Sequence, residues 1–126
     1  MVFIPGLLSS QDLHIKNTNF NVTKGLQINI DRSIVNRGTI NNEGVISVRG
    51  NWVNTGVYND NLTGELEFDG TDLQYINHGE QPLNNLTLVN GRKHLSTNTY
   101  VRKKLHLDQI VFQLELKLLI KEHPIQ

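Results

Sequence analysis

Four glycines recur every six residues in the middle of this chain, and this spacing constrains the fold more than any other feature. They are Gly38, Gly44, Gly50 and Gly56, and the residues two positions after them are all large and apolar: Ile40, Ile46, Trp52 and Tyr58. Three of these glycines also close an Asn-x-Gly triplet. A six-residue unit provides about four strand residues and a corner of about two, where glycine supplies positive φ without a Cβ clash.

Units of this kind predict a coiled β-ribbon whose corners lie above one another. Alternate side chains of a strand point to opposite faces, so one large apolar residue per unit points inward. Asn side chains in register can hydrogen-bond along the stack, which accounts for 16 asparagines among 126 residues. We therefore expect an all-β, single-domain β-solenoid, similar to a parallel β-helix, with short strands and Gly/Asn corners.

Further strands are expected on both sides of the four units, and the chain has no alanine, the best helix former. Apolar patterns predict strands at Leu13 and Ile15, Leu26 to Ile30, Leu66 and Phe68, Leu73 to Ile76, Leu86 and Leu88, Tyr100 to Lys103, and Leu105 and Leu107. The longest alternation, from Ile110 to Ile120, predicts a last strand. If its apolar face is uncovered, we expect self-association at this exposed end of the solenoid.

The first residues form a separate segment, and we place the solenoid domain at residues 12–126. Leu7 to Gln11 resembles the end of a secretory signal peptide without its basic region and half of its apolar region. Residues 1–11 are interpreted either as a truncated signal-peptide tail or as a disordered or strand-forming N-terminus. No run approaches the roughly 20 apolar residues of a spanning helix, so no membrane span is expected.

The stretch from Gly38 to Tyr58, GTINNEGVISVRGNWVNTGVY, resembles repeats in large secreted proteins of the Bacteroidetes. The segments 64–77 and 83–90 are similar to those that follow in these proteins. The resemblance implies a secreted or surface-exposed repeat protein with parallel β-helix character and an adhesive or structural role, without established catalytic residues. The chain departs from the family at Arg102-Lys103-Lys104 and reaches Gln126 with no sorting domain, so we expect a segment of a longer protein.

Several acidic residues are candidates for chemistry. Glu65 and Glu67 share one face of a predicted strand, and Asp69 and Asp72 flank the next turn. Paired carboxylates can act as general acid and base on a polysaccharide. Acids that alternate with core residues are also typical of any half-buried strand, so we assign no catalytic residue. Asp69 to Asp72 also resembles a calcium-binding turn, but an ordinary Asp-Gly turn explains it as well, and no metal is assigned.

The remaining candidates have structural explanations. The five histidines are interpreted as surface residues without metal-ligand spacing: His14, His78, His94, His106 and His123. Trp52 and Tyr58 could stack on a sugar ring if they pointed outward, but their register predicts core positions. The basic residues of the C-terminal third are interpreted as solvated surface, and no nucleic acid is expected: Arg92, Lys93, Arg102, Lys103 and Lys104.

Three functions are compatible with these patterns. The first is a non-catalytic extracellular repeat module, a structural or adhesive segment of a larger secreted or surface protein, with polysaccharide or other surface proteins as partners. The second is a carbohydrate-binding or polysaccharide-active β-helix protein. The third, a hexapeptide-type acyltransferase, fits worst because Trp52 and Tyr58 stand where such enzymes keep small aliphatic residues. We therefore predict a protein that is not an enzyme and has no cofactor.

Overall fold

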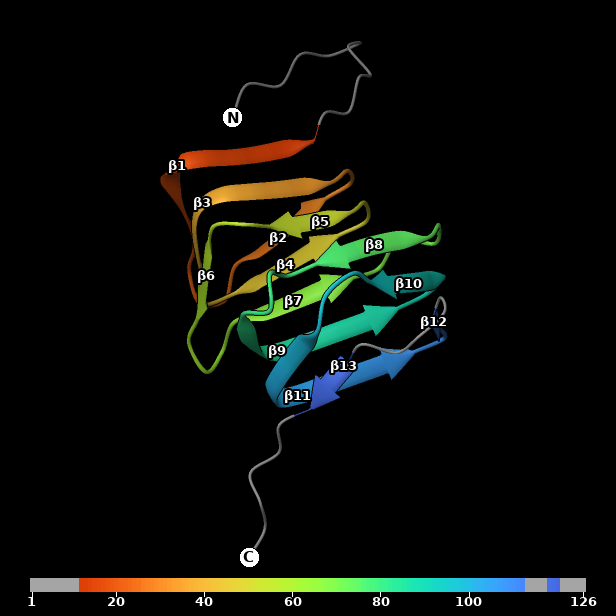
Figure 1. Cartoon of the computed structure of the whole chain (residues 1–126). Coiled ribbons are helices and arrows are strands. Elements are labelled where there is room, and N and C mark those ends of the chain that lie inside the picture. Colours follow the sequence, from red (N-terminus) through yellow and green to blue (C-terminus); the bar gives the residue numbers. More distant parts are fainter. Residues whose placement is uncertain (1–11, 113–117, 121–126) are drawn as a thin grey trace, which may run out of the picture.

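The computed structural model describes residues 12–112 and 118–120, and Figure 1 shows these residues as a stack of parallel strands in two sheets. The described residues contain no helix. The strands are β1 Leu13–Val22, β2 Gln27–Ile30, β3 Ile34–Asn42, β4 Val45–Val48, β5 Trp52–Asn54, β6 Val57–Asp60, β7 Glu65–Phe68, β8 Gln74–Asn77, β9 Pro82–Val89, β10 Arg92–Leu95, β11 Thr99–Asp108, β12 Val111–Phe112 and β13 Leu118–Ile120. The predicted all-β solenoid is confirmed, with about five turns.

The chain visits the two sheets in turn as it winds along the solenoid. The first sheet has the order β1-β3-β5-β8-β10-β12, with β6 beside the second half of β3, and the other has the order β13-β11-β9-β7-β4-β2. Ile34 pairs with Trp52 and Ile40 pairs with Tyr58, in each case 18 positions later. One such turn therefore holds three six-residue units. Successive units form successive sides of a turn, and equivalent residues stack every third unit.

The lumen is filled by columns of apolar side chains that continue from turn to turn. Ile46, Leu66 and Leu86 pair on consecutive strands of the second sheet, and all three are buried. The four apolar residues of the six-residue units, Ile40, Ile46, Trp52 and Tyr58, are also buried, as predicted. Because each inward side chain packs on its equivalents in the neighbouring turns, the repeats share one continuous core.

The glycines at the corners are required for close approach rather than for backbone conformation. The prediction that those of the six-residue units have positive φ is wrong, because the described glycines with positive φ are Gly25, Gly79 and Gly91. A Cβ added at Gly56 would overlap the carbonyl oxygen of Gly38 in the preceding turn. The corners therefore need glycine because the backbone of one turn packs directly on that of the next.

The C-terminal segment differs from the single strand predicted from Ile110 to Ile120. Its described parts belong to different sheets, since β12 pairs with β10 in the first sheet and β13 pairs with β11 in the second. The chain therefore changes sheet within the predicted strand; residues 113–117 and the N-terminal residues 1–11 lie outside the described residues. Within the described part there is no helix with the length and hydropathy that crossing a bilayer requires.

Candidate functional site

An exposed ladder of asparagines crosses the outer surface of three strands. The side-chain amide of Asn59 on β6 donates to Asn41 on β3 at 3.0 Å, and Asn41 donates in turn to Asn21 on β1 at 2.8 Å. The three residues are in register, because Asn21 pairs with Asn41 and Asn41 pairs with Asn59. Each amide therefore fixes the orientation of the next, which gives a rigid row of hydrogen-bonding groups at the surface.

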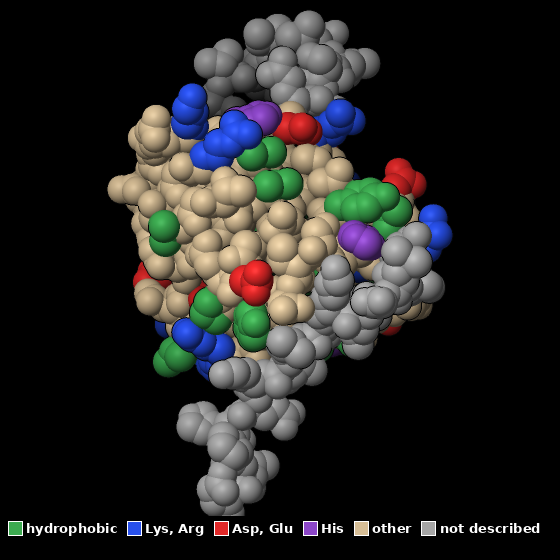
Figure 2. Space-filling view, viewed as in Figure 1, with side chains coloured by type: hydrophobic (Ala, Val, Ile, Leu, Met, Phe, Trp, Pro, Cys, Tyr) green, Lys and Arg blue, Asp and Glu red, His purple; other side chains and the backbone are tan. Residues whose placement is uncertain are grey.

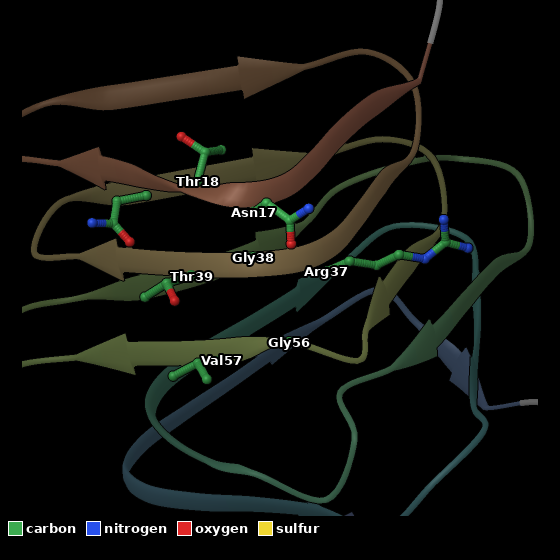
Figure 3. Close-up of a pocket in the computed structure, with 8 residues that line it drawn as sticks. Asn17, Thr18, Arg37, Gly38, Thr39, Gly56 and Val57 are labelled. Atoms are coloured by element: carbon green, nitrogen blue, oxygen red, sulfur yellow. The ribbon is translucent and has the colours of Figure 1, made fainter.

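Two hollows lie on either side of this row. An open groove of about 600 Å³ runs past Gly38 and Gly56, and its lining also includes Thr18, Thr39 and Val57 (Figure 3). The groove passes the point where the backbones of Gly38 and Gly56 pack on one another. A second hollow of about 240 Å³ is lined by the three ladder asparagines and their neighbours, including Asn42, Glu43 and Asn61.

A second asparagine ladder lies inside the solenoid, on β3 and β5. Asn36 on β3 donates to the side chain of Asn54 on β5 at 2.8 Å and to the carbonyl oxygen of Val57 at 3.0 Å. Its own side-chain oxygen accepts from the backbone N–H of Gly38 at 3.0 Å. Both asparagines are fully buried. The internal ladder therefore satisfies polar backbone groups at the corners, as buried polar groups require, and its burial keeps it away from a ligand.

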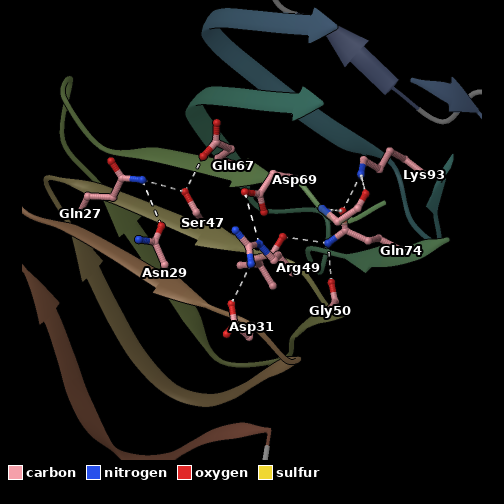
Figure 4. Close-up of polar contacts among 12 residues, drawn as sticks. Gln27, Asn29, Asp31, Ser47, Arg49, Gly50, Glu67, Asp69, Gln74 and Lys93 are labelled. Carbon is pink, nitrogen blue, oxygen red and sulfur yellow. Dashed lines mark hydrogen bonds and ion pairs between the residues drawn. The ribbon is translucent and has the colours of Figure 1, made fainter. Parts of the chain in front are cut away.

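The acidic candidates have different hydrogen-bonding or ion-pair partners. Glu67 accepts a hydrogen bond from the hydroxyl of Ser47 on β4 (Figure 4). Glu65 accepts one from the hydroxyl of Thr87 on β9 at 2.8 Å. Asp69 lies 3.8 Å from the guanidinium of Arg49, and Asp72 is exposed. No group of three or more His, Cys, Asp or Glu residues that could hold a metal ion is found among the described residues.

Lys93 is an interior residue, although its sequence context predicted a solvated surface position. Its ammonium group donates to the carbonyl oxygen of Gly70 at 2.9 Å and to the side chain of Gln74 at 2.6 Å (Figure 4). Burial lowers the pKa of Lys93 to about 8, although the negative charge of Asp69 partly opposes this shift. The other four basic candidates, Arg92, Arg102, Lys103 and Lys104, are exposed as predicted.

The histidines are also divided between core and surface. His14 and His106 are exposed, His94 is half-buried against Tyr75, and His123 lies outside the described residues. His78 contradicts the surface interpretation, since it is buried and stacked on Trp52.

Contacts with the core hold His78 neutral. Its Nδ1 accepts a hydrogen bond from the indole N–H of Trp52 at 3.0 Å, and its buried Nε2 has no partner among the described residues. Burial lowers the pKa of His78 to about 4, so the ring is neutral at physiological pH.

The aromatic pair of the six-residue units lies in the core and offers no surface for a sugar. Trp52 and Tyr58 pack edge to face with ring centroids 6.1 Å apart. The hydroxyl of Tyr58 accepts from the side chain of Asn42 at 3.1 Å, and burial raises its pKa above the usual range. Burial also raises the pKa of nearby Asp60, although a backbone hydrogen bond from Asn84 at 2.8 Å opposes this shift.

The sequence predicts stacked asparagines, but the six-residue unit does not indicate which of them lie on the outer surface. Asn41 and Asn59 are 18 positions apart, the same interval that separates Gly38 from Gly56. Recurrence at one turn rather than at one unit is therefore the signal that places both asparagines on one outer face. Comparison with known proteins gave no match, whether to protein-family models, to curated proteins or to solved structures, so function is inferred from the chain's own residues.

Proposed function

We propose that this chain is a non-catalytic β-solenoid repeat module that serves as a structural or adhesive segment of a larger secreted or surface protein. The observation that carries the proposal is the register between turns, because it stacks side chains of the same kind on one another at many positions. The buried pair Asn36 and Asn54 and the apolar column at Ile46, Leu66 and Leu86 are examples. Such a molecule gains length by adding turns without changing its cross-section.

A structural segment has to resist force applied along its chain. We expect single-molecule stretching of the full chain to release it in steps of one turn. Turns of 18 residues, as between Ile34 and Trp52, and of 24 residues, as between Trp52 and Ile76, correspond to steps of about 60 to 85 Å. Unfolding in a single event at negligible force would argue against a load-bearing role.

The extracellular location is tested separately. We expect an antibody against the folded chain to label intact cells of the source organism. Labelling that needs permeabilised cells would place the protein inside the cell and refute this part of the proposal. The resemblance of the segment 38–58 to repeats of secreted proteins, which stays a prediction, is the reason for proposing a surface location.

A carbohydrate-binding or polysaccharide-active protein is the alternative function. The exposed ladder of Asn21, Asn41 and Asn59 favours binding, because amide groups are suited to hydroxyl-rich polymers. Cleavage would need Glu65 and Glu67, which each accept a hydrogen bond from a neighbouring hydroxyl. We expect no new reducing ends when the chain is incubated with polysaccharides. Product formation that is lost in Glu67→Gln would instead make the protein an enzyme.

A further inference from the structure

The outer surface of β1, β3 and β6 carries two parallel columns of uncharged side chains, here called the amide face: Asn19, Thr39 and Val57 in one column and Asn21, Asn41 and Asn59 in the other. In the view of Figure 2, most of the molecular surface is likewise backbone or side chains that are neither apolar nor charged. Arg37 and Glu43 belong to the linings of the flanking hollows. A ligand on this face therefore meets hydrogen-bonding groups of low net charge.

The ladder leaves hydrogen-bonding capacity directed at solvent. An Asn amide has two N–H donors and an oxygen with two lone pairs. Asn41 uses one donor toward Asn21 and one lone pair toward Asn59, so one donor and one lone pair remain. Neighbouring hydroxyls of a sugar, each both donor and acceptor, complement this pair of groups. The ladder also holds the amide in place before binding, which reduces the entropy lost on association.

The shape of the surface indicates an elongated ligand. The groove beside Gly38 and Gly56 and the hollow beside the asparagine ladder flank the same three strands. Val57, which is 46% exposed, adds an apolar contact next to Thr39 that suits the C–H face of a sugar ring. A chain lying across the strands would meet equivalent groups at each strand, about 4.8 Å apart.

We propose that the amide face binds a neutral polysaccharide. This inference rests on the adhesive form of the proposed function and names its ligand class. A neutral chain is favoured over an acidic one because the two columns themselves carry no charge; the cations Lys16 and Arg37 pair beside the first column, and the carboxylate of Glu43 lines the hollow beside the second. Association then depends on side-chain amides and hydroxyls, so it should vary little with salt concentration.

Calorimetry with the full chain tests the assignment. The probes are three neutral polysaccharides, mixed-linkage β-glucan, galactomannan and arabinoxylan, and two acidic ones, alginate and polygalacturonate. We expect saturable binding to at least one neutral probe, weakened roughly tenfold in Asn41→Ala and in Thr39→Ala. The matched control is Asn29→Ala, which removes an exposed amide from β2 on the other sheet and should bind as wild type does. Fluorescence of the buried Trp52 verifies that each variant is folded.

Three outcomes would overturn the assignment: no binding to any neutral probe, binding to acidic probes alone, or equal weakening by Asn29→Ala and Asn41→Ala. The assignment would also be overturned if the chain bound no polysaccharide but caused ice to grow as faceted crystals. The regular row of polar side chains would then match the lattice of ice rather than a sugar chain. Any of these results, with stepwise mechanical unfolding retained, would leave the structural role standing. Loss of stepwise unfolding, with binding retained, would remove only the structural role.

Discussion

The two asparagine ladders of this solenoid have the same chemistry and share strand β3, yet they do different things. Asn36 points into the lumen, where its side-chain amide is hydrogen-bonded to Asn54, to the carbonyl oxygen of Val57 and to the N–H of Gly38. Asn41 points outward and bonds to equivalent asparagines in the neighbouring turns, with capacity remaining. Parity along the strand decides between the two roles, because adjacent side chains face opposite sides.

The comparison shows that the contribution of a side chain to stability depends on whether water can replace it as the hydrogen-bond partner of its neighbours. Water can hydrogen-bond to the neighbours of Asn41, so its loss leaves no polar group unpaired. The partners of Asn36 are buried or partly buried, so water replaces its hydrogen bonds less completely and part of their desolvation is then uncompensated. The inner ladder therefore supports the fold, and the outer ladder is available for binding.

The largest effect is expected at the corner that connects the two ladders. Gly56→Ala should lower the free energy of unfolding by about 4 kcal/mol, because the new methyl group would collide with the backbone of Gly38. Urea unfolding followed by circular dichroism measures this. The matched control is Gly25→Ala, where φ is +85° but no atom lies near the added Cβ, and a cost of only about 1 to 2 kcal/mol is expected. Equal losses at the two sites would show that crowding is unimportant.

Removal of the inner ladder should come next in size. Asn36→Ala leaves three groups without their partner, one buried and two partly buried, and we expect a loss of about 3 kcal/mol in the free energy of unfolding. The same urea experiment measures it. A loss below about 1 kcal/mol would mean that the buried ladder contributes little to stability.

Acid should weaken the interior before it affects the outer face. The pKa of His78 is lowered from 6.5 to about 4 in the folded chain, so between these values the unfolded chain binds one more proton. The free energy of unfolding should therefore decrease as the pH is lowered, by about 2 kcal/mol between pH 8 and pH 5. His78→Gln should lose most of this slope, whereas His106→Gln, which changes an exposed residue, should retain it. An unchanged slope in His78→Gln would assign the acid sensitivity to other groups.

The smallest effect on stability is expected from the outer ladder. Asn41→Ala removes an amide that water can replace, so the free energy of unfolding should change by no more than about 0.5 kcal/mol. Differential scanning calorimetry of wild type and variant checks this. A loss approaching that of Asn36→Ala would remove the distinction between the two ladders.

Much of the fold was predictable because the glycine spacing and the apolar parity are local signals. They placed Ile40, Ile46, Trp52 and Tyr58 in the core and predicted stacked asparagines, and the structure confirms both. The conformation of the corner glycines was predicted wrongly, because crowding between turns involves residues 18 positions apart and cannot be seen within one unit.

The candidate site was less predictable for the same reason. Lys93 looks like a surface residue in the sequence, but its position opposite Gln74 in the neighbouring turn makes it an interior hydrogen-bond donor. The amide face likewise depends on which residues stack, and this follows from the number of residues per turn rather than from any local motif. His78 has no local signal at all, since its burial results from the packing of distant aromatic residues.

The 18-residue interval between Asn36 and Asn54 also dictates how the length of this part of the chain can change. Excising one unit would move every later residue to the next side of the cross-section and put unlike side chains on top of one another. Excising residues 37–54 would join Asn36 directly to Thr55, the natural successor of the equivalent Asn54, and would shorten the solenoid by a whole turn while every surviving layer keeps its register. Insertions and deletions that preserve the architecture must therefore add or remove complete turns.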